Sequence, residues 1–321
     1  MRVTRLLFSA EINILRLHSL LLLLAAVVTA LASPRMGDAA LVHDVARDAD
    51  YRAYGNSFDS VLWGYSRNAG GTIESVFSGV LVDQYWVLTA AHAVGPTTAS
   101  LTFGTGSNII SDPGTSVASS VFYVHPTYSG VLIEGSYDLA MVRLSTPLPA
   151  TPVPLYTGPI NSGDYSVVGF GRTGVSGGPT TYDGNLRGGI NYTAFRATNQ
   201  SFGYQFVDSS NANYRTLGSL VQPGDSGGGF FFDDGSGFKL AGITSAVATL
   251  PGSGPRPPWV YGDFGFASNI DIPWVNGFIA TTAVPEPHAV VATVVLGASF
   301  FARRQRQKRR RQDEADPAAA A

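Results

Sequence analysis

Residues 221–229 carry the most information in this chain, and they read Val221-Gln222-Pro223-Gly224-Asp225-Ser226-Gly227-Gly228-Gly229. Glycine has no Cβ, so glycines on either side of a serine let backbone NH groups come close to a bound molecule. The stretch therefore predicts a nucleophilic serine, Ser226, in a loop that can also receive a negatively charged oxygen.

Two upstream segments supply the partners that such a serine needs. Residues 87–92 end an apolar run at His92, and residues 137–144 place Asp138 before another apolar run. A histidine, an aspartate and a serine in this chain order match one of the known orders of a hydrolase triad. We therefore expect His92 as the base and Asp138 as the carboxylate that orients it.

The pattern between these segments is typical of an all-β protein. Short apolar runs alternate with turn residues, as expected for a sandwich or barrel. Residues 233–237, Asp-Asp-Gly-Ser-Gly, predict a hairpin turn, and the proline-rich stretch 146–159 is the expected boundary between two halves. The predicted strands lie at residues 75–82, 86–88, 99–103, 121–124, 139–144, 165–171, 229–232 and 238–247.

Over Val61 to Ile279 the chain resembles the trypsin-like serine proteases of the chymotrypsin fold. Residues 78–92 are similar to the histidine segment of that family, residues 124–140 to its aspartate segment, and residues 224–228 to its serine segment. The resemblance implies two antiparallel β-barrels and a short C-terminal helix, with the active site between the barrels. It places His92 and Asp138 in the first barrel and Ser226 in the second.

The resemblance also implies the role of each residue. Ser226 would attack a peptide carbonyl, and the NH groups of Gly224 and Ser226 would form the oxyanion hole. The substrate pocket would have Leu220 at its floor, with Ser245 and Val247 on its wall. Because tryptic members carry an aspartate where this chain has Leu220, we expect a preference for small or apolar residues before the cut. Neither a cofactor nor a metal is expected, and the substrates would be proteins or peptides.

One departure from the family concerns activation. In the usual zymogen arrangement, cleavage frees an Ile-Val-Gly-Gly-type N-terminus whose amine pairs with the aspartate before the serine, here Asp225. No such sequence precedes the histidine segment. Two alternatives remain open from the sequence: another internal group holds Asp225, or a cut between Ala39 and Ser60 supplies the amine.

Both ends of the chain predict export. Residues 1–32 have basic residues, an apolar run and a small-residue cleavage site, as in a signal peptide. Residues 284–311 contain Pro285-Glu286-Pro287, an apolar segment and a basic cluster, and they resemble the PEP-CTERM sorting signal. That resemblance implies transient anchoring in the inner membrane, processing by an exosortase-type enzyme, and a bacterial protein displayed on the cell surface or released. A plain C-terminal membrane anchor is the alternative.

These boundaries leave 33–60 as a lead-in of uncertain structure, 61–283 as the protease-like domain, and 312–321 as a tail. The formal net charge of the whole chain is −2. The densest cluster of basic residues, Arg303 to Arg311, lies in the sorting segment. Without both ends the chain is more acidic, which disfavours binding to nucleic acid. It has no cysteine, so disulfides and thiolate chemistry are excluded.

Two other functions fit part of the pattern. A non-catalytic cell-surface protein that keeps the protease fold would carry the same motifs. An esterase of the α/β-hydrolase fold is disfavoured, because its triad runs serine, acid, histidine and its strands alternate with helices.

Overall fold

The structure is a computed structural model that describes residues 41–43, 46–249 and 259–281. The predicted signal peptide and sorting segment lie outside these residues. The described residues up to Asn276 belong to one compact unit, and Gly277 begins a second one. No helix in the described ranges has both the length and the apolar run that a bilayer crossing requires.

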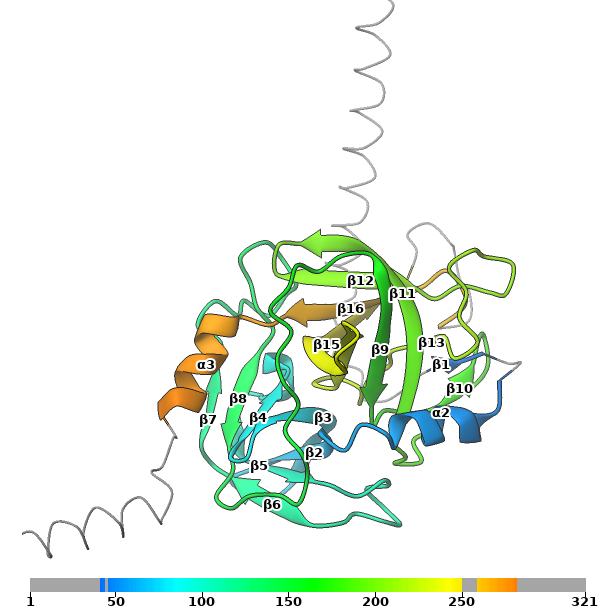
Figure 1. The fold of residues 1–321 in the computed structure, drawn as a ribbon. Coiled ribbons are helices and arrows are strands. Elements are labelled where there is room, and N and C mark those ends of the chain that lie inside the picture. Colours follow the sequence, from blue (N-terminus) through cyan, green and yellow to red (C-terminus); the bar gives the residue numbers. More distant parts are fainter. Residues whose placement is uncertain (1–40, 44–45, 250–258, 282–321) are drawn as a thin grey trace, which may run out of the picture. The chain divides into compact units, whose positions relative to one another are not determined.

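Two large antiparallel sheets form most of the first unit (Figure 1). One has seven strands in the order β6-β5-β2-β3-β4-β8-β7. Its strands are β2 (Val61–Asn68), β3 (Ile73–Asp83), β4 (Trp86–Thr89), β5 (Thr98–Gly104), β6 (Ser116–Ser119), β7 (Phe122–Val124) and β8 (Ala140–Arg143). All four residues of β4 are buried, as the apolar run Trp86-Val87-Leu88 predicts for a strand between two others.

The other large sheet is a closed barrel of six strands in the order β11-β12-β16-β15-β14-β9. Its strands are β9 (Gly163–Gly169), β11 (Arg187–Thr198), β12 (Ser201–Gln205), β14 (Gly229–Asp233), β15 (Phe238–Ala248) and β16 (Phe264–Asn269). The fold is therefore mostly β, as predicted. The first sheet has β6 and β7 at its edges and the second sheet closes, and this pair of sheets is consistent with the predicted chymotrypsin-type fold.

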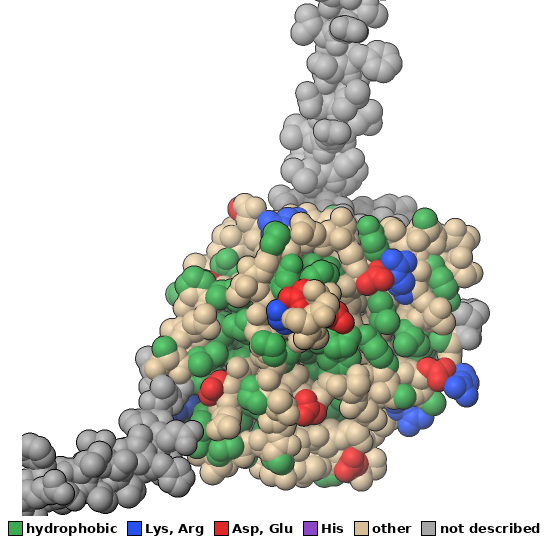
Figure 2. All heavy atoms as spheres, in the orientation of Figure 1, with side chains coloured by type: hydrophobic (Ala, Val, Ile, Leu, Met, Phe, Trp, Pro, Cys, Tyr) green, Lys and Arg blue, Asp and Glu red, His purple; other side chains and the backbone are tan. Residues whose placement is uncertain are grey.

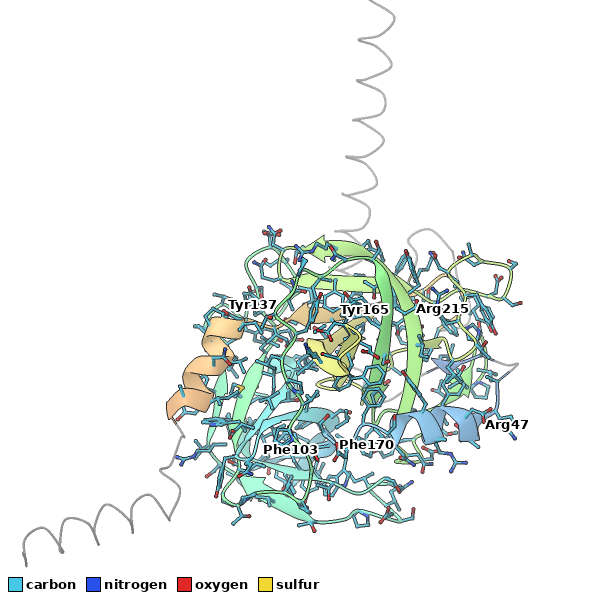
Figure 3. All side chains as sticks on the ribbon, in the orientation of Figure 1. Arg47, Phe103, Tyr137, Tyr165, Phe170 and Arg215 are labelled. Atoms are coloured by element: carbon cyan, nitrogen blue, oxygen red, sulfur yellow. The ribbon has the colours of Figure 1, made fainter. Side chains whose placement is uncertain are left out.

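Each sheet surrounds its own apolar core. Phe103 and Tyr165, both labelled in Figure 3, belong to the cores of the seven-stranded sheet and the barrel respectively. A Cβ at Gly79 would lie 2.5 Å from the Phe103 ring, so glycine on β3 makes room for that ring. Burial of such side chains stabilises the fold by about 1.5 to 3 kcal/mol each, which matters in a chain that lacks disulfides.

The lead-in is folded over much of its length. β1 (Leu41–Val42) forms a small sheet with β10 (Gly174–Val175) and β13 (Ser219–Leu220), and α2 (Asp48–Gly55) contacts β11. Tyr51 and Gly55 are the buried residues of α2, and their spacing of four places them on one face. Neither element was predicted, because a two-residue strand has no periodicity and a helix with two buried residues shows little apolar pattern.

The remaining elements are short. η1 (Ala91–Ala93) follows β4. α3 (Ile272–Thr281) begins after β16 and is the short C-terminal helix that was expected. Residues 146–159 lie between β8 and β9, and residues 233–237 join β14 to β15. On the face drawn in Figure 2, acidic and basic side chains are few and lie among hydrophobic and uncharged ones.

Candidate active site

His92 is held by the short helix that follows β4. Its neighbours Ala91 and Ala93 are buried, so the alanines fix this turn while the side chain of His92 stays 36% exposed. The backbone NH of His92 donates to Asp138 Oδ1 at 2.9 Å, and its Nδ1 lies 2.7 Å from Asp138 Oδ2. An ionised carboxylate only accepts hydrogen bonds, so Nδ1 is the donor, and Nε2 of the neutral ring is an acceptor.

Asp138 immediately precedes Leu139 and β8, and its side chain is 4% exposed. Ser245 on β15 donates its hydroxyl to Oδ2 of Asp138. The backbone NH of Asp138 donates in turn to the Ser268 hydroxyl at 3.1 Å. A buried carboxylate without partners would be strongly unfavourable. Here His92 and Ser245 supply those partners, and strands of both sheets hold the aspartate in place.

Ser226 lies in the loop between β13 and β14. Its Oγ is 2.7 Å from Nε2 of His92, and its carbonyl accepts the NH of Ser78 at 2.7 Å. Gly227 next to it has a φ of +83°, and a Cβ there would lie 2.0 Å from the Ser78 carbonyl oxygen. Only glycine permits this approach. The structure therefore brings the three predicted triad residues together.

The charges of this cluster shift both pKa values. Burial would lower the pKa of His92, but the charge and hydrogen bond of Asp138 outweigh burial and raise it above 6.5. Burial would raise the pKa of Asp138, but His92 and the Ser245 hydroxyl together lower it below 3.8. Near neutral pH, Asp138 is thus ionised and His92 favours its charged form more than a free imidazole does.

The loop before Ser226 is fixed from several sides. Gly224 has a φ of +101°, and its carbonyl accepts the Ser78 hydroxyl at 3.0 Å. Asp225 accepts the NH groups of Gly171 and Gln222 at 2.9 and 3.0 Å. Within residues 46–249, no backbone hydrogen bond from the NH of Gly224 or of Ser226 is formed.

The predicted pocket residues have different surroundings. Leu220 is fully buried in an apolar cluster with Leu41 and Phe206. Val247 is partly buried and pairs with Gly265 of β16. Ser245, expected on the pocket wall, directs its hydroxyl to Asp138. Residues 250–258, which follow β15 closely, lie outside the described ranges.

Three residues that we did not single out also support the site. Ser78 contacts the Ser226 loop through its NH and its hydroxyl, and Ser268 accepts the NH of Asp138. The hydroxyl of Tyr204 accepts the NH of Val221 at 3.0 Å, close to Leu220. Each acts across strands that are distant in sequence, so no local motif marks them.

Comparison with known proteins agrees with this geometry. The sequence model of the family described as "Trypsin" matches residues 54–268. The chain belongs to the trypsin family of serine proteases. All seven predicted site residues fall within the matched range, whereas β1 and most of α2 precede it.

Two relatives within the trypsin family carry the same name, "Chymotrypsin-like elastase family member 1". The protein from Rattus norvegicus is 25% identical over 234 residues, which cover 67% of this chain and 82% of the relative. The protein from Canis lupus familiaris is 26% identical over 237 residues, which cover 66% of this chain and 84% of the relative. This chain is thus similar to both over most of their length.

The pKa of His92 can be measured directly. We expect NMR titration of the His92 ring to give a value above the ordinary 6.5 or so, because Asp138 stabilises the charged ring. In Asp138→Asn the value should fall below 6.5, since burial then acts unopposed. The His92→Gln variant assigns the signal. A native pKa at or below 6.5 would contradict the described charge balance.

Proposed function

We propose that this protein is an exported serine endopeptidase. The observation that carries the proposal is the pair of 2.7 Å contacts that join Ser226 Oγ to His92 Nε2 and His92 Nδ1 to Asp138 Oδ2. A neutral histidine so oriented can take the serine proton. Membership of the trypsin family supports the same reaction class.

In the proposed mechanism, Ser226 Oγ attacks the scissile carbonyl carbon while its proton passes to Nε2 of His92. The NH groups of Gly224 and Ser226 receive the oxyanion, and each such donor contributes about 3 kcal/mol in comparable hydrolases. His92 then gives the proton to the leaving amine, which leaves an acyl group on Ser226. Water, activated by His92, releases the acid and restores the serine.

Asp138 stays ionised throughout this cycle, because its surroundings lower its pKa. Its role is to hold the imidazole in the tautomer with a proton on Nδ1 and to stabilise the imidazolium. The hydrogen bond from Ser245 keeps the carboxylate in place without neutralising it. We therefore assign Ser245 to the support of Asp138 as well as to the pocket wall.

Removal of the nucleophile tests the function. We expect Ser226→Ala to lower kcat on a mixed peptide library by about a million-fold, and we expect a second change at His92 to cost little more. The exposed Ser236→Ala is the matched control and should keep full activity. Peptide hydrolysis retained in folded Ser226→Ala, or native protein that fails to react with a serine-directed phosphonate, would point instead to a non-catalytic surface protein.

We also propose specificity for small or medium apolar residues before the cut. Leu220 offers no charge to a lysine or arginine head group, which would lose hydration without gaining an ion pair. Val247 opposite Gly265 would narrow the pocket. The word elastase in the names of both relatives agrees with this preference.

Peptides that differ only at that residue test the pocket. We expect kcat/KM to be higher for Ala, Val or Leu than for Arg or Lys. In Val247→Gly the ratio of kcat/KM for Phe to that for Val should rise by about tenfold or more, because a branched side chain is removed from the wall. The partly exposed Val121→Gly should leave this ratio unchanged. A native preference for Arg or Lys would refute the pocket assignment.

Export and processing would shorten the chain, and the mass of the mature protein tests this. We propose that the mature protein has lost residues 1–32 and the segment that follows Pro285-Glu286-Pro287. Intact-mass analysis of protein recovered from the native cells should therefore show neither the leader nor the basic cluster. A mature species that still carries Arg303 to Arg311 would exclude exosortase-type processing and support a plain membrane anchor.

A further inference from the structure

Residues 221–228 between β13 and β14 carry Ser226 and are called the nucleophile loop here. β1 and α2 approach this loop from a part of the chain that largely precedes the family match. β1 pairs with β13 in antiparallel register, so that Leu41 faces Leu220 and Val42 faces Ser219. Leu220 leads directly into the loop that carries Ser226. The position of this loop therefore depends on a strand ahead of the histidine segment.

The Tyr51 hydroxyl makes a second connection. The Tyr51 side chain is fully buried, and its hydroxyl accepts the NH of His43 at 3.1 Å and lies 3.0 Å from the carbonyl oxygen of Gly218, to which it donates. Burial raises the pKa of Tyr51, so the hydroxyl remains a donor. One side chain of α2 thus joins the residue after β1 to the residue before β13.

α2 itself is anchored by a buried charge. Arg187 is 3% exposed; its Nε donates to Asp48 on α2 at 2.6 Å, and its Nη1 and Nη2 donate to Asp183 at 2.8 and 2.6 Å. Removing one partner of a buried ion pair is strongly destabilising. At the other end of α2, a Cβ on Gly55 would lie 2.6 Å from the backbone of Arg187. The helix is thus fixed to β11 at both ends.

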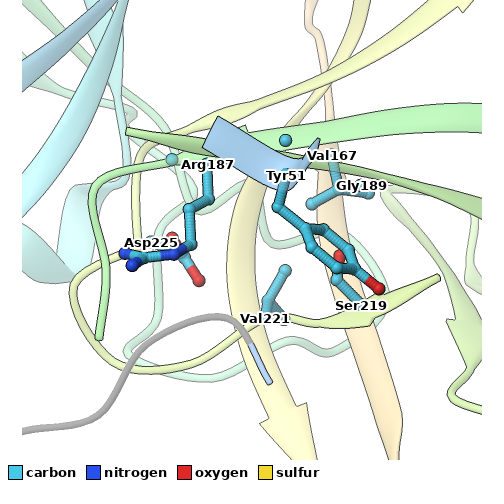
Figure 4. Close-up of a pocket in the computed structure, with 9 residues that line it drawn as sticks. Tyr51, Val167, Arg187, Gly189, Ser219, Val221 and Asp225 are labelled. Atoms are coloured by element: carbon cyan, nitrogen blue, oxygen red, sulfur yellow. The ribbon is translucent and has the colours of Figure 1, made fainter. Parts of the chain in front are cut away.

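A small cavity lies between this helix and the nucleophile loop. Figure 4 shows Arg187 and Asp225 on one side of it and Tyr51 and Ser219 on the other. Its volume is about 10 Å³, which has room for about one water molecule. The Asp225 carboxylate at its edge is already held by two backbone NH groups.

We propose that β1 and α2 of the uncut chain hold the nucleophile loop in its working conformation, as a newly cut N-terminus does in zymogen-type relatives, with Tyr51 as the positioning residue. This inference rests on the proposed function of the same site. It means that no cut between Ala39 and Ser60 activates the enzyme. A cut within α2 would inactivate it, because Tyr51 would lose its fixed place.

The first test identifies the reactive species. Full-length chain is expressed, labelled with a biotinylated fluorophosphonate, and the labelled protein is measured by intact mass, with Ser226→Ala as the blank. We expect the label on species that begin at or before Leu41. Label found only on species that begin between Val42 and Ser60 would overturn the inference while leaving the proposed function standing. No Ser226-dependent label on any species would overturn both.

The second test compares two tyrosines of α2. Tyr51→Phe should lower the phosphonylation rate constant per folded molecule by about tenfold or more, because it removes both hydrogen bonds of the buried hydroxyl, to the His43 NH and to the Gly218 carbonyl. Tyr54→Phe is the matched control: its hydroxyl bonds Ser166 at 2.6 Å and not the segment that enters β13, so we expect an unchanged rate constant.

A purely structural role gives a different result. If both variants lower the melting temperature but leave the rate constant per folded molecule at the native value, the positioning role is refuted. If Tyr51→Phe does not fold, Asp48→Asn provides the measurement, because it weakens the bond from Asp48 to Arg187 on β11 and, on α2 itself, the exposed pair with Arg52. We expect Asp48→Asn to lower the rate constant by about twofold to fivefold; an unchanged value would also refute the proposal.

Discussion

The contact between Ser78 and the nucleophile loop is the interaction on which the site depends. His92 and Asp138 belong to the seven-stranded sheet, whereas Ser226 belongs to the barrel, and each sheet has its own core. Ser78 on β3 joins them: its NH donates to the Ser226 carbonyl, and its hydroxyl donates to the Gly224 carbonyl and accepts the NH of Phe170. These bonds set the separation across which a proton can pass between Ser226 and His92.

Electrostatic balance is the second requirement, and it is met in two places by different means. Beside Ser226, the buried carboxylate of Asp138 is stabilised by hydrogen bonds with the His92 ring and the Ser245 hydroxyl, so the carboxylate stays ionised. Beneath the nucleophile loop, the buried guanidinium of Arg187 is compensated by Asp48 and Asp183. Hydrogen bonds from Arg187 and Asn185 outweigh the opposing effect of burial and lower the pKa of Asp183 to about 2. Both buried charges also join segments distant in sequence.

The sequence predicted the parts of this molecule whose signals are local. His92, Asp138 and Ser226 each lie in a short motif, and most strands of both sheets show as apolar runs. Ser78 and Ser268 were not predicted as supports, because their roles exist only after strands from different regions meet. β1 was missed because two residues carry no periodicity, and α2 because its apolar face amounts to Tyr51 and Gly55.

The division of the proposed catalytic groups, His92, Asp138 and Ser226, between two sheets with separate cores has a consequence for behaviour on heating. The contacts that align Ser226 with His92 are a handful of hydrogen bonds, whereas each core is held by many buried side chains. Because local opening requires less free energy than unfolding a core, thermal motion separates the two halves of the site first. We therefore expect the contact between Ser226 and His92 to be lost at a temperature where both sheets are still intact, and we expect cooling to restore it without refolding either sheet.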